Sequence, residues 1–447
     1  MNDGSGQALN YVLAAIVISG AIQVVLGFFK LGRLADVFHP SVIHGILAAI
    51  GIIIFAKQIN IAFGTTTEAT QAIAIILDFT RNLSNINPFV AIISVSGLLL
   101  MIFHSKISYK LFHFLPAPFW VLVLSIPFVY AFNFFEPHVL HIFNKAYAVG
   151  PSLLVDIPDS FMDALAYPNF SKINTLPFWL SVLSITMIAS IETLASAKAV
   201  DKLDPYKRRT DLNKDLVGVG LSTMVSGLVG GLPIITVIVR STVNVHNNAK
   251  TKWSNLYHGI IILIFIFFLA PVIQQVPLSA LAIILVYTGY KLTSPRVFKH
   301  VFDQGIEQLI FFVGTLLITL LTNLLFGILG GMLLVLLVHI LVARLPVSIF
   351  FKNIFKSGTK LELQKNGDYH LKIKGVSNFL SVLSLDKLYN KIPLDANVNV
   401  NVSEASLVDA TVLESIYDFE RRLESKSGSM KIIGAVVMLL RRIINWL

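Results

Sequence analysis

The sequence predicts an α-helical polytopic membrane protein that continues into a small cytosolic α/β domain. Of its 447 residues, 55% are hydrophobic and only 13% are charged, which is too little polar surface to cover a soluble protein of this size. Apolar runs long enough to cross a bilayer recur as far as residue 344. Beyond that residue the pattern changes to short alternating segments, which are typical of strands.

The apolar runs define a transmembrane domain at residues 1–344 with about eleven segments, nine of them near the length a bilayer requires. Two short pieces, 233–246 after Gly230-Gly231 and Pro233, and 276–290 after Pro277, are expected to be half-helices or tilted spans. Broken helices are tolerated in a membrane only where protein or a water-filled cavity satisfies the freed backbone groups. The longer runs cover residues 8–29, 41–57, 88–104, 117–134, 177–199, 213–231, 254–272, 304–321 and 323–344.

Basic residues gather in the loops on one side of these segments, and the positive-inside rule makes that side cytoplasmic. The chain is therefore expected in the cell inner membrane with its C-terminal domain in the cytoplasm. Eleven crossings would then leave Met1 outside with no signal peptide before the first span, so an odd number of helices is expected upstream. The cytoplasmic set is Lys30, Arg33, Lys106, Lys110, Lys202, Lys207, Arg208, Arg209, Lys214, Lys250, Lys252, Lys291, Arg296, Lys299 and Arg344, against Lys57, Arg81, Lys145 and Lys172 on the other side.

Residues 345–434 are predicted to form the α/β domain, and residues 435–447 a terminal helix. The ending AVVMLLRRIINWL is too short to span a membrane and carries Arg441 and Arg442 among apolar residues, which fits an amphipathic helix at the membrane surface. A terminal helix packed on the small domain is the alternative. Within the domain, strands are expected at 361–364, 369–375, 397–403 and 431–434, and a helix at 411–425.

Several classes of function are excluded by what the sequence lacks. It has no Cys, hence no disulfide, thiolate metal site or cysteine nucleophile. The net charge of +10 comes from Lys and Arg in short loops, where they serve topology, so no nucleic-acid partner is expected. No Ser-His-Asp arrangement, P-loop or dinucleotide fingerprint is present, and His104, His113, His138 and His141 have no ligand at metal-binding spacing. We expect neither an enzyme nor a cofactor.

The segment GGLPIITVIVRSTVN contains a candidate anion site. A helix that begins at mid-membrane presents unpaired N–H groups and the positive end of its dipole, and Pro233 suits such a start. The expected donors are the Thr236 hydroxyl and the amides of Thr236, Val237, Ile238 and Val239, with Arg240 adding positive charge one turn later. The alternative is a Gly-Pro kink in a packed helix, with Arg240 reaching toward the cytoplasmic surface.

Glu192 is the candidate coupling residue. Ionisable groups at bilayer depth are costly and mark solute pathways. Ser196 lies one helical turn from Glu192, so the carboxylate and the hydroxyl could share a cavity and hold a proton or a sodium ion. The alternative is a structural Glu192 paired with Arg240 or Lys198 to join two helices.

The run from 190 to 259, beginning SIETLASAKAVDKLDPYKRRTDLNKDL and continuing through GGLPIITVIVRSTVN, resembles the SulP anion permeases, bacterial relatives of the solute carrier family 26 transporters. Residues 31–59 are similar to the family's fifth helix and residues 277–292 to its twelfth. The resemblance implies fourteen segments in two inverted repeats of seven, with a core domain that moves against a gate domain. It also implies an anion between the third and tenth half-helices, a homodimer and a C-terminal STAS-like domain.

The chain departs from the family pattern at two points. Residue 8 corresponds to the start of the fourth segment, so the first three segments, including one half-helix, have no counterpart. Sodium-coupled bicarbonate members share the carboxylate of Glu192 and the hydroxyl of Ser196, but their third hydroxyl falls near Ile238, which is aliphatic. This weakens sodium coupling and leaves proton coupling or exchange open. Arg240 and Ser241 match the Arg-Ser pair of the sulfate-type and animal members, which adds Ser241 to the substrate-binding candidates.

The segment SLVDATVLESI (406–416) resembles the STAS loop and its following helix. Asp409 matches the acidic residue that precedes a phosphorylatable hydroxyl in that loop, Ala410 occupies the usual hydroxyl position, and Thr411 is next. The resemblance implies a regulatory role for Asp409 and Thr411. The alternative is that Asp409 is simply the N-cap of a helix that begins near Ala410.

The expected function is secondary transport of a small inorganic anion, of the sulfate or bicarbonate class, by alternating access. Backbone amides at a helix N-terminus recognise charge more than shape, so the particular anion stays open. An anion channel on the same scaffold and a truncated, non-transporting anchor for the STAS-like domain are the alternatives. A nucleobase permease would need carboxylates aimed at ring N–H groups. The expected partners are the anion, the lipid bilayer, a second copy of the chain and a cytosolic partner of the STAS-like domain.

Overall fold

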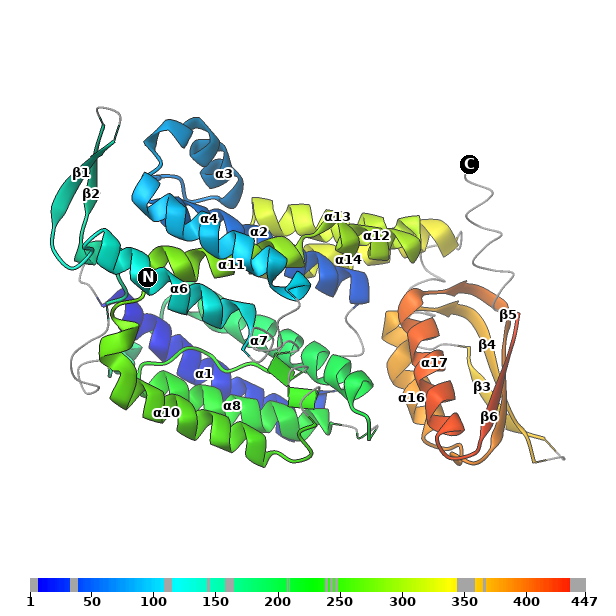
Figure 1. Ribbon diagram of the computed structural model, residues 1–447. Helices are drawn as coiled ribbons and strands as arrows, with labels where there is room; N and C mark the ends of the chain where they lie inside the picture. Colours follow the sequence, from blue (N-terminus) through cyan, green and yellow to red (C-terminus); the bar gives the residue numbers. More distant parts are fainter. Residues whose placement is uncertain are drawn as a thin grey trace.

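The structure, a computed structural model, consists of a helical body followed by a smaller α/β body at the C-terminal end (Figure 1). It describes residues 7–32, 39–107, 115–142, 145–156, 165–206, 208, 210–237, 240–241, 244–245, 248–343, 358–364 and 367–434. Of the residues discussed above, Arg33, Lys110, His113, Lys207, Arg209, Ile238, Val239, Arg344 and 435–447 lie outside this part of the chain.

The helical body follows the predicted apolar runs closely. Five helices are long and apolar enough to cross a membrane: α1 (Ala8–Phe28), α2 (Pro40–Phe63), α7 (Leu176–Leu203), α10 (Trp253–Ile273) and α14 (Leu324–Ala343). The shorter helices are α3 (Ala72–Arg81), α4 (Pro88–Phe103), α6 (Ala117–Ala131), α8 (Leu212–Leu228), α11 (Leu278–Leu292), α12 (Pro295–Asp303) and α13 (Ile306–Leu321).

A hairpin of two strands was not predicted. Strands β1 (His138–Ile142) and β2 (Lys145–Val149) pair in antiparallel register after α6. Val149 is buried, and the cluster that contains it also holds Phe89 of α4 and Phe134. The hairpin thus closes one end of the α4 and α6 pair.

Helix starts in this body are set by side chains that replace missing backbone partners. The side chain of Asp211 accepts hydrogen bonds from the amides of Asn213 and Lys214 at the start of α8. At the start of α4, the side chain of Asn87 accepts from the Phe89 amide, with Pro88 in the first turn. Both arrangements satisfy N–H groups that have no partner within the helix.

Two pairs of glycines bring helix backbones into direct contact. A Cβ atom on Gly20 of α1 would lie 2.6 Å from the carbonyl oxygen of Gly220 on α8, and one on Gly220 would lie 2.7 Å from that of Gly20. Gly51 of α2 and Gly289 of α11 are related in the same way, at 2.7 and 2.5 Å. Small residues permit this close packing of membrane helices, which is driven by van der Waals contact. Among the described helices, the two most closely packed pairs are therefore α1 with α8 and α2 with α11.

We expect Gly220→Ala to destabilise the protein, because the new methyl group would overlap the α1 backbone, at a cost of about 1–3 kcal/mol. Gly218 lies on the same helix, and a Cβ there would meet nothing within 4 Å. Gly218→Ala is therefore the matched control, and it should be neutral or stabilising by up to about 1 kcal/mol. Thermal unfolding of the two purified variants in detergent tests this. Equal midpoints would contradict the proposed close contact.

The C-terminal body contains a four-stranded sheet in the order β3-β4-β5-β6. β4 (Tyr369–Ser377), β5 (Asn397–Val408) and β6 (Ser429–Ile433) are parallel, and β3 (Lys360–Leu363) pairs antiparallel at one edge. Helices α16 (Val382–Tyr389) and α17 (Ala410–Glu424) cover the sheet, with Tyr389 stacked on Phe419 at a centroid distance of 4.3 Å. The predicted α/β domain is confirmed, although its sequence pattern did not reveal α16.

Candidate functional site

The Gly-rich segment after α8 is an extended chain held by hydroxyl groups. The fully buried Thr223 of α8 accepts a hydrogen bond from the Ile234 amide at 3.1 Å and donates one to the Ile234 carbonyl at 3.3 Å. Ser226 donates to the Leu232 carbonyl at 2.6 Å. Two α8 side chains thus satisfy backbone groups of the non-helical segment, as a broken membrane helix requires.

The chain becomes helical after Val237. The Val237 carbonyl accepts hydrogen bonds from the Ser241 amide at 3.4 Å and from the Ser241 hydroxyl at 2.8 Å, and residues 240–241 and 244–245 are helical. The half-helix therefore starts later than the prediction, which placed its start at Pro233. The reason is tertiary, because the bonds from α8 keep the chain extended through the residues after Pro233.

Thr236, the first predicted anion donor, is already bonded within the protein. Its amide donates to the Thr193 hydroxyl of α7 at 3.3 Å, and its side chain lies beside the carboxylate of Asp215 in α8. In this conformation the Thr236 amide therefore has a partner within the protein, and its role as an anion donor stays a prediction. Asp215, a carboxylate near the start of an apolar run, was not singled out in the sequence.

Glu192 is half-buried on α7 and makes no hydrogen bond or ion pair with any residue that the structure describes. Neither ion pair of the structural alternative, with Arg240 or with Lys198, is formed in this conformation. Ser196, one turn away, is buried, whereas Arg240 is exposed on the half-helix. The geometry brings Glu192 next to the Thr193–Thr236 contact but does not bring Arg240 into a buried site.

Buried hydroxyl groups form a row along one face of α7, near Glu192. Thr186, Ser190 and Thr193 are each at most 8% exposed, and their spacing of four and three residues places them on one helix face. The fully buried Gln23 of α1 donates to the Ser190 hydroxyl at 3.3 Å. Within the described residues, Gln23 Oε1 and Thr186 Oγ1 have no hydrogen-bond partner. The interface between α1 and α7 therefore contains polar side chains near the broken segment. The helical spacing of the Ser and Thr residues in the sequence could have indicated this polar face.

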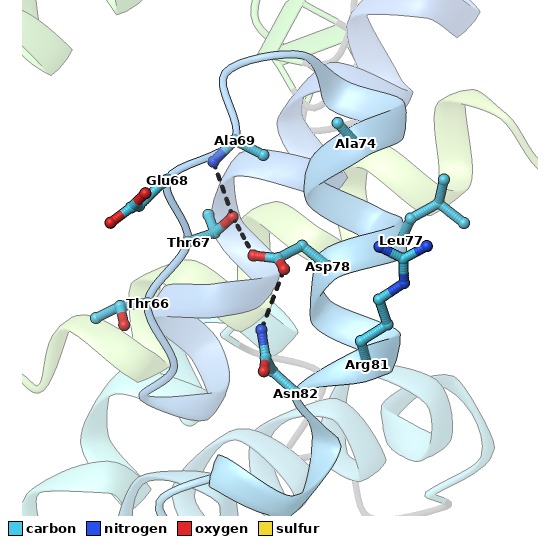
Figure 2. Close-up of a pocket in the computed structure, with 9 residues that line it drawn as sticks. All are labelled: Thr66, Thr67, Glu68, Ala69, Ala74, Leu77, Asp78, Arg81 and Asn82. Carbon is cyan, nitrogen blue, oxygen red and sulfur yellow. Dashed lines mark hydrogen bonds between the residues drawn. The ribbon is translucent and has the colours of Figure 1, made fainter.

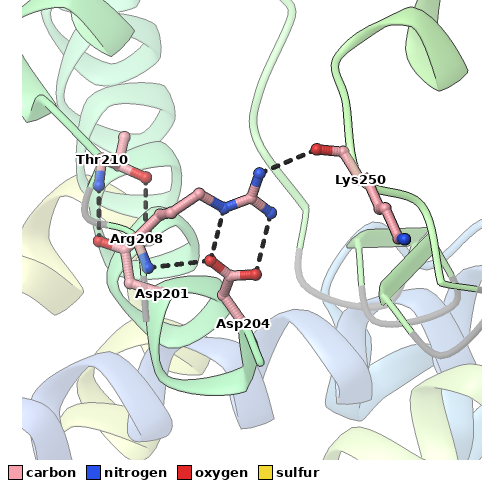
Figure 3. Close-up of polar contacts among 5 residues, drawn as sticks. All are labelled: Asp201, Asp204, Arg208, Thr210 and Lys250. Carbon is pink, nitrogen blue, oxygen red and sulfur yellow. Dashed lines mark hydrogen bonds and ion pairs between the residues drawn. The ribbon is translucent and has the colours of Figure 1, made fainter. Parts of the chain in front are cut away.

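The loop between α7 and α8 is tied to the chain after the half-helix. Asp204 accepts two hydrogen bonds from the Arg208 guanidinium at 2.8 and 3.0 Å, and Arg208 also donates to the Lys250 carbonyl at 2.9 Å (Figure 3). These bonds hold the pKa of the Asp204 carboxyl at about 2. Thr210 donates to Asp201 through its amide and its hydroxyl. Through Arg208, the loop thus ties the end of α7 to the chain that follows the half-helix.

A surface hollow of about 660 Å³ lies apart from this segment, between α2 and α3 (Figure 2). Its polar groups bond to one another: Thr67 donates to Asp78 at 2.5 Å, and Asn82 donates to the same carboxylate at 3.2 Å. Two carboxylates, Glu68 and Asp78, line the hollow beside a single Arg81. Its charge does not favour an anion, so the hollow is not the predicted site.

The predicted regulatory pair lies at the start of α17. The Asp409 carboxylate accepts from the Val412 amide at 2.8 Å, which is N-cap geometry. Thr411 is only 8% exposed and so is not open to a kinase in this conformation. The structure favours the N-cap alternative for Asp409.

A model of the Sulfate permease family matches residues 1–314. The chain belongs to the sulfate permease family. It is 24% identical over 313 residues to the bicarbonate transporter BicA of Picosynechococcus, in an alignment that covers 70% of this chain and 52% of that protein. The chain thus spans about half the length of the curated relatives it matches.

Solved structures show the same fold. The transmembrane domain of a cyanobacterial bicarbonate transporter BicA is similar with a TM-score of 0.58 and 21% identity, covering 73% of this chain and 77% of that one. The murine Solute Carrier 26 family member A9 anion transporter, in its inward-facing state, gives a TM-score of 0.61 and 15% identity, covering 97% and 70%. The predicted family and fold class are confirmed. The relatives are named as transporters and permeases, in agreement with the expectation of a protein that is not an enzyme.

Proposed function

We propose that this sulfate permease family chain takes part in secondary transport of a small inorganic anion, of the sulfate or bicarbonate class, across the inner membrane. Glu192, which has no partner among the described residues, precedes the buried Thr193 on α7, and the Thr193 hydroxyl accepts a hydrogen bond from the Thr236 amide. The observation that carries the proposal is the change from non-helical to helical chain after Val237, next to this contact. A helix that starts there directs its first amides, and the positive end of its dipole, at one point. That arrangement attracts an anion without a permanent buried cation.

The proposed binding groups are the amides that follow Val237, together with the hydroxyls of Thr236 and Ser241. Each hydroxyl has lone pairs and one proton and can exchange an internal hydrogen bond for one to the anion. Arg240 supplies a long-range positive field from its exposed position on the same short helix. Bicarbonate and sulfate both fit this chemistry, because backbone amides select charge before shape.

In the proposed coupling, Thr193 connects Glu192 to the anion site. Thr193 follows Glu192 on α7 and holds the Thr236 amide, so a change of charge at Glu192 moves or loosens the contact that fixes the start of the half-helix. A proton is the simplest coupling ion, since a carboxylate without a partner at bilayer depth favours its neutral form. A sodium ion would need further oxygen ligands beside Glu192 and Ser196.

Alternating access is proposed to arise from relative movement of two helix groups. The residues of the candidate site belong to α7, α8 and the half-helix, and α1 packs closely against α8. The other group contains α2, α11, α13 and α14, in which Gly51 of α2 meets Gly289 of α11 and α2 also packs against α13 and α14. Rigid groups that slide past each other around a fixed site are the usual basis of alternating access. The C-terminal domain is proposed to be cytoplasmic, with homodimer and cytosolic-partner contacts as in the sequence-based expectation.

Counterflow in proteoliposomes tests the proposal. The purified chain, reconstituted into vesicles preloaded with unlabelled sulfate or bicarbonate, is expected to take up the labelled anion faster than unloaded vesicles do. Uptake that does not saturate and shows no counterflow would indicate a channel. No uptake of either anion, with the chain folded and inserted, would refute the transport proposal and favour an anchoring role for the membrane domain.

A further inference from the structure

Three side chains that can bind a metal meet at the junction of the two bodies. His39 precedes α2, His339 lies near the end of α14, and Asp409 lies between β5 and α17. One ligand atom from each lies within 4.8 Å of the other two. All three residues are buried, at 0%, 1% and 4% exposure. The cluster therefore joins residues from distant parts of the sequence in a site closed to solvent.

The sheet topology explains why Asp409 reaches the helical body. β4 and β5 are parallel neighbours, so the residues that follow them emerge at the same end of the sheet, where both strands finish. Phe379 follows β4 and Asp409 follows β5, and the Asp409 carboxylate accepts a hydrogen bond from the Phe379 amide at 2.5 Å. Phe379 packs into a core cluster with Val42 of α2 and Val335 of α14. The small domain therefore contacts the membrane helices through this end of its sheet.

Two imidazole nitrogens in the cluster lack partners. The Nδ1 atom of His39 accepts from the Ser41 amide at 3.3 Å, which leaves Nε2 for another ligand. Among the described residues, His39 Nε2 and His339 Nδ1 have no hydrogen-bond partner, although both atoms are buried. A buried polar atom without a hydrogen-bond partner lowers the free energy of unfolding by about 1–3 kcal/mol. Two such atoms in one cluster therefore point to a bound ligand that pairs with them.

The rings around the cluster are apolar. The ring of Phe311 lies 5.1 Å from that of His39 and 5.6 Å from that of His339, and the Phe379 ring lies 6.4 and 6.3 Å away. The Asp409 carboxyl is buried in the same cluster, where a cation would supply a counter-charge.

We propose that His39, His339 and Asp409 form a binding site for a divalent transition metal of the zinc class, which fastens the α/β domain to the membrane helices. Two imidazoles and one carboxylate are a common donor set for zinc, and they leave one coordination position for water. An ion at the centre of three atoms at the observed spacing would be within about 2.8 Å of each, whereas zinc bonds are about 2.0–2.2 Å long. Side-chain movement of less than an ångström closes the difference.

The amide bonds to Asp409 are compatible with this role. Its two carboxylate oxygens accept from the amides of Phe379 and Val412, but each oxygen has a second lone pair free for an ion. Such backbone bonds orient a metal-bound carboxylate. The N-cap bond and the metal bond can therefore exist together.

Metal content and thermal stability of the full chain test the site. The protein is purified in detergent through a tag that binds no metal, stripped with a chelator, dialysed and supplied with Zn²⁺ or Mg²⁺ alone. We expect about one equivalent of bound Zn²⁺ per chain, and a rise in the unfolding midpoint because a ligand that binds only the folded state stabilises it. Mg²⁺ prefers oxygen ligands and should produce neither effect.

Three variants assign the binding to the cluster. His39→Gln, His339→Gln and Asp409→Asn should each weaken Zn²⁺ binding by about tenfold or more, the scale on which changes around a metal site act. Asp409→Asn is the most informative variant, because Asn is also a good N-cap residue and the substitution should leave the start of α17 folded. His258→Gln, at an exposed position of α10, is the control and should bind as the parent chain does. Absence of bound Zn²⁺ in the parent chain, equal binding by all four variants, or an equal shift with Mg²⁺ would overturn the proposal.

Discussion

Glu192→Gln is expected to remove the dependence of anion uptake on pH or sodium and to lower uptake by about tenfold, within the range typical of a coupling between two sites. The carboxylate is half-buried on α7 and has no partner among the described residues. A proton or a cation is therefore the means by which its charge can be compensated at bilayer depth. Glutamine keeps the shape of the side chain and cannot ionise, so transport would proceed at a low rate that no longer follows the coupling ion.

Initial uptake rates in proteoliposomes, measured across a pH series with sodium or choline as the cation, give the result directly. Glu68→Gln is the control, because it removes a carboxylate in the surface hollow between α2 and α3 and should leave the profile unchanged. An unchanged pH and sodium profile in Glu192→Gln would remove Glu192 from the coupling role. If deletion of residues 345–447 abolished the cellular phenotype while Glu192→Gln and Arg240→Ala left it intact, the anchoring alternative would hold instead.

Thr223→Val is expected to abolish uptake by releasing the extended segment before the half-helix. The Thr223 hydroxyl bonds both the amide and the carbonyl of Ile234. Valine has nearly the same size but no polar group, so both backbone groups would lose their partner. Each partly buried backbone group that loses its partner costs up to about 1–3 kcal/mol. The start of the half-helix would then shift, and with it the amides proposed to bind the anion.

Ser222→Ala is the matched control for this variant. Ser222 is adjacent on α8, but its side chain is exposed and its hydroxyl bonds only to the Gly218 carbonyl of the same helix. Uptake and thermal unfolding midpoint are measured for both variants at equal amounts of inserted protein. We expect Ser222→Ala to behave as the parent chain. Thr223→Val with parental uptake and stability would show that the observed hydroxyl bonds do not maintain the site.

The sequence predicted the elements of this protein better than their contacts. The strands expected at 369–375 and 397–403 agree with β4 and β5, and the apolar runs agree with the helices, because hydropathy and alternation are properties of local sequence. α16 was missed because its eight residues lie between two strong strand signals. The hairpin of β1 and β2 was missed because its residues show no clear alternation and connect two apolar helices.

At the candidate site the sequence indicated which segment is broken but not how it is bonded, and the roles of the site residues stay a prediction. The broken segment and Glu192 stood out because glycine, proline and a carboxylate are rare in an apolar run. The partners of Thr236 did not stand out. Thr193 and Asp215 belong to other helices, and their contact with Thr236 depends on how α7 and α8 are packed. The alternative roles weighed for Asp409 likewise needed the fold, which showed its amide bonds and its burial.

Membrane class, family and the location of the broken helix thus follow from composition and local pattern alone, because each depends on residue type and on spacing along the chain. Three features do not: the start of the half-helix after Val237, a Glu192 carboxylate without a partner among the described residues, and the meeting of His39 with His339 and Asp409. Each depends on contacts between residues far apart in sequence, and such contacts are set by close packing of helices and by strand order. Those long-range contacts decide which polar groups are satisfied and which remain available for a ligand.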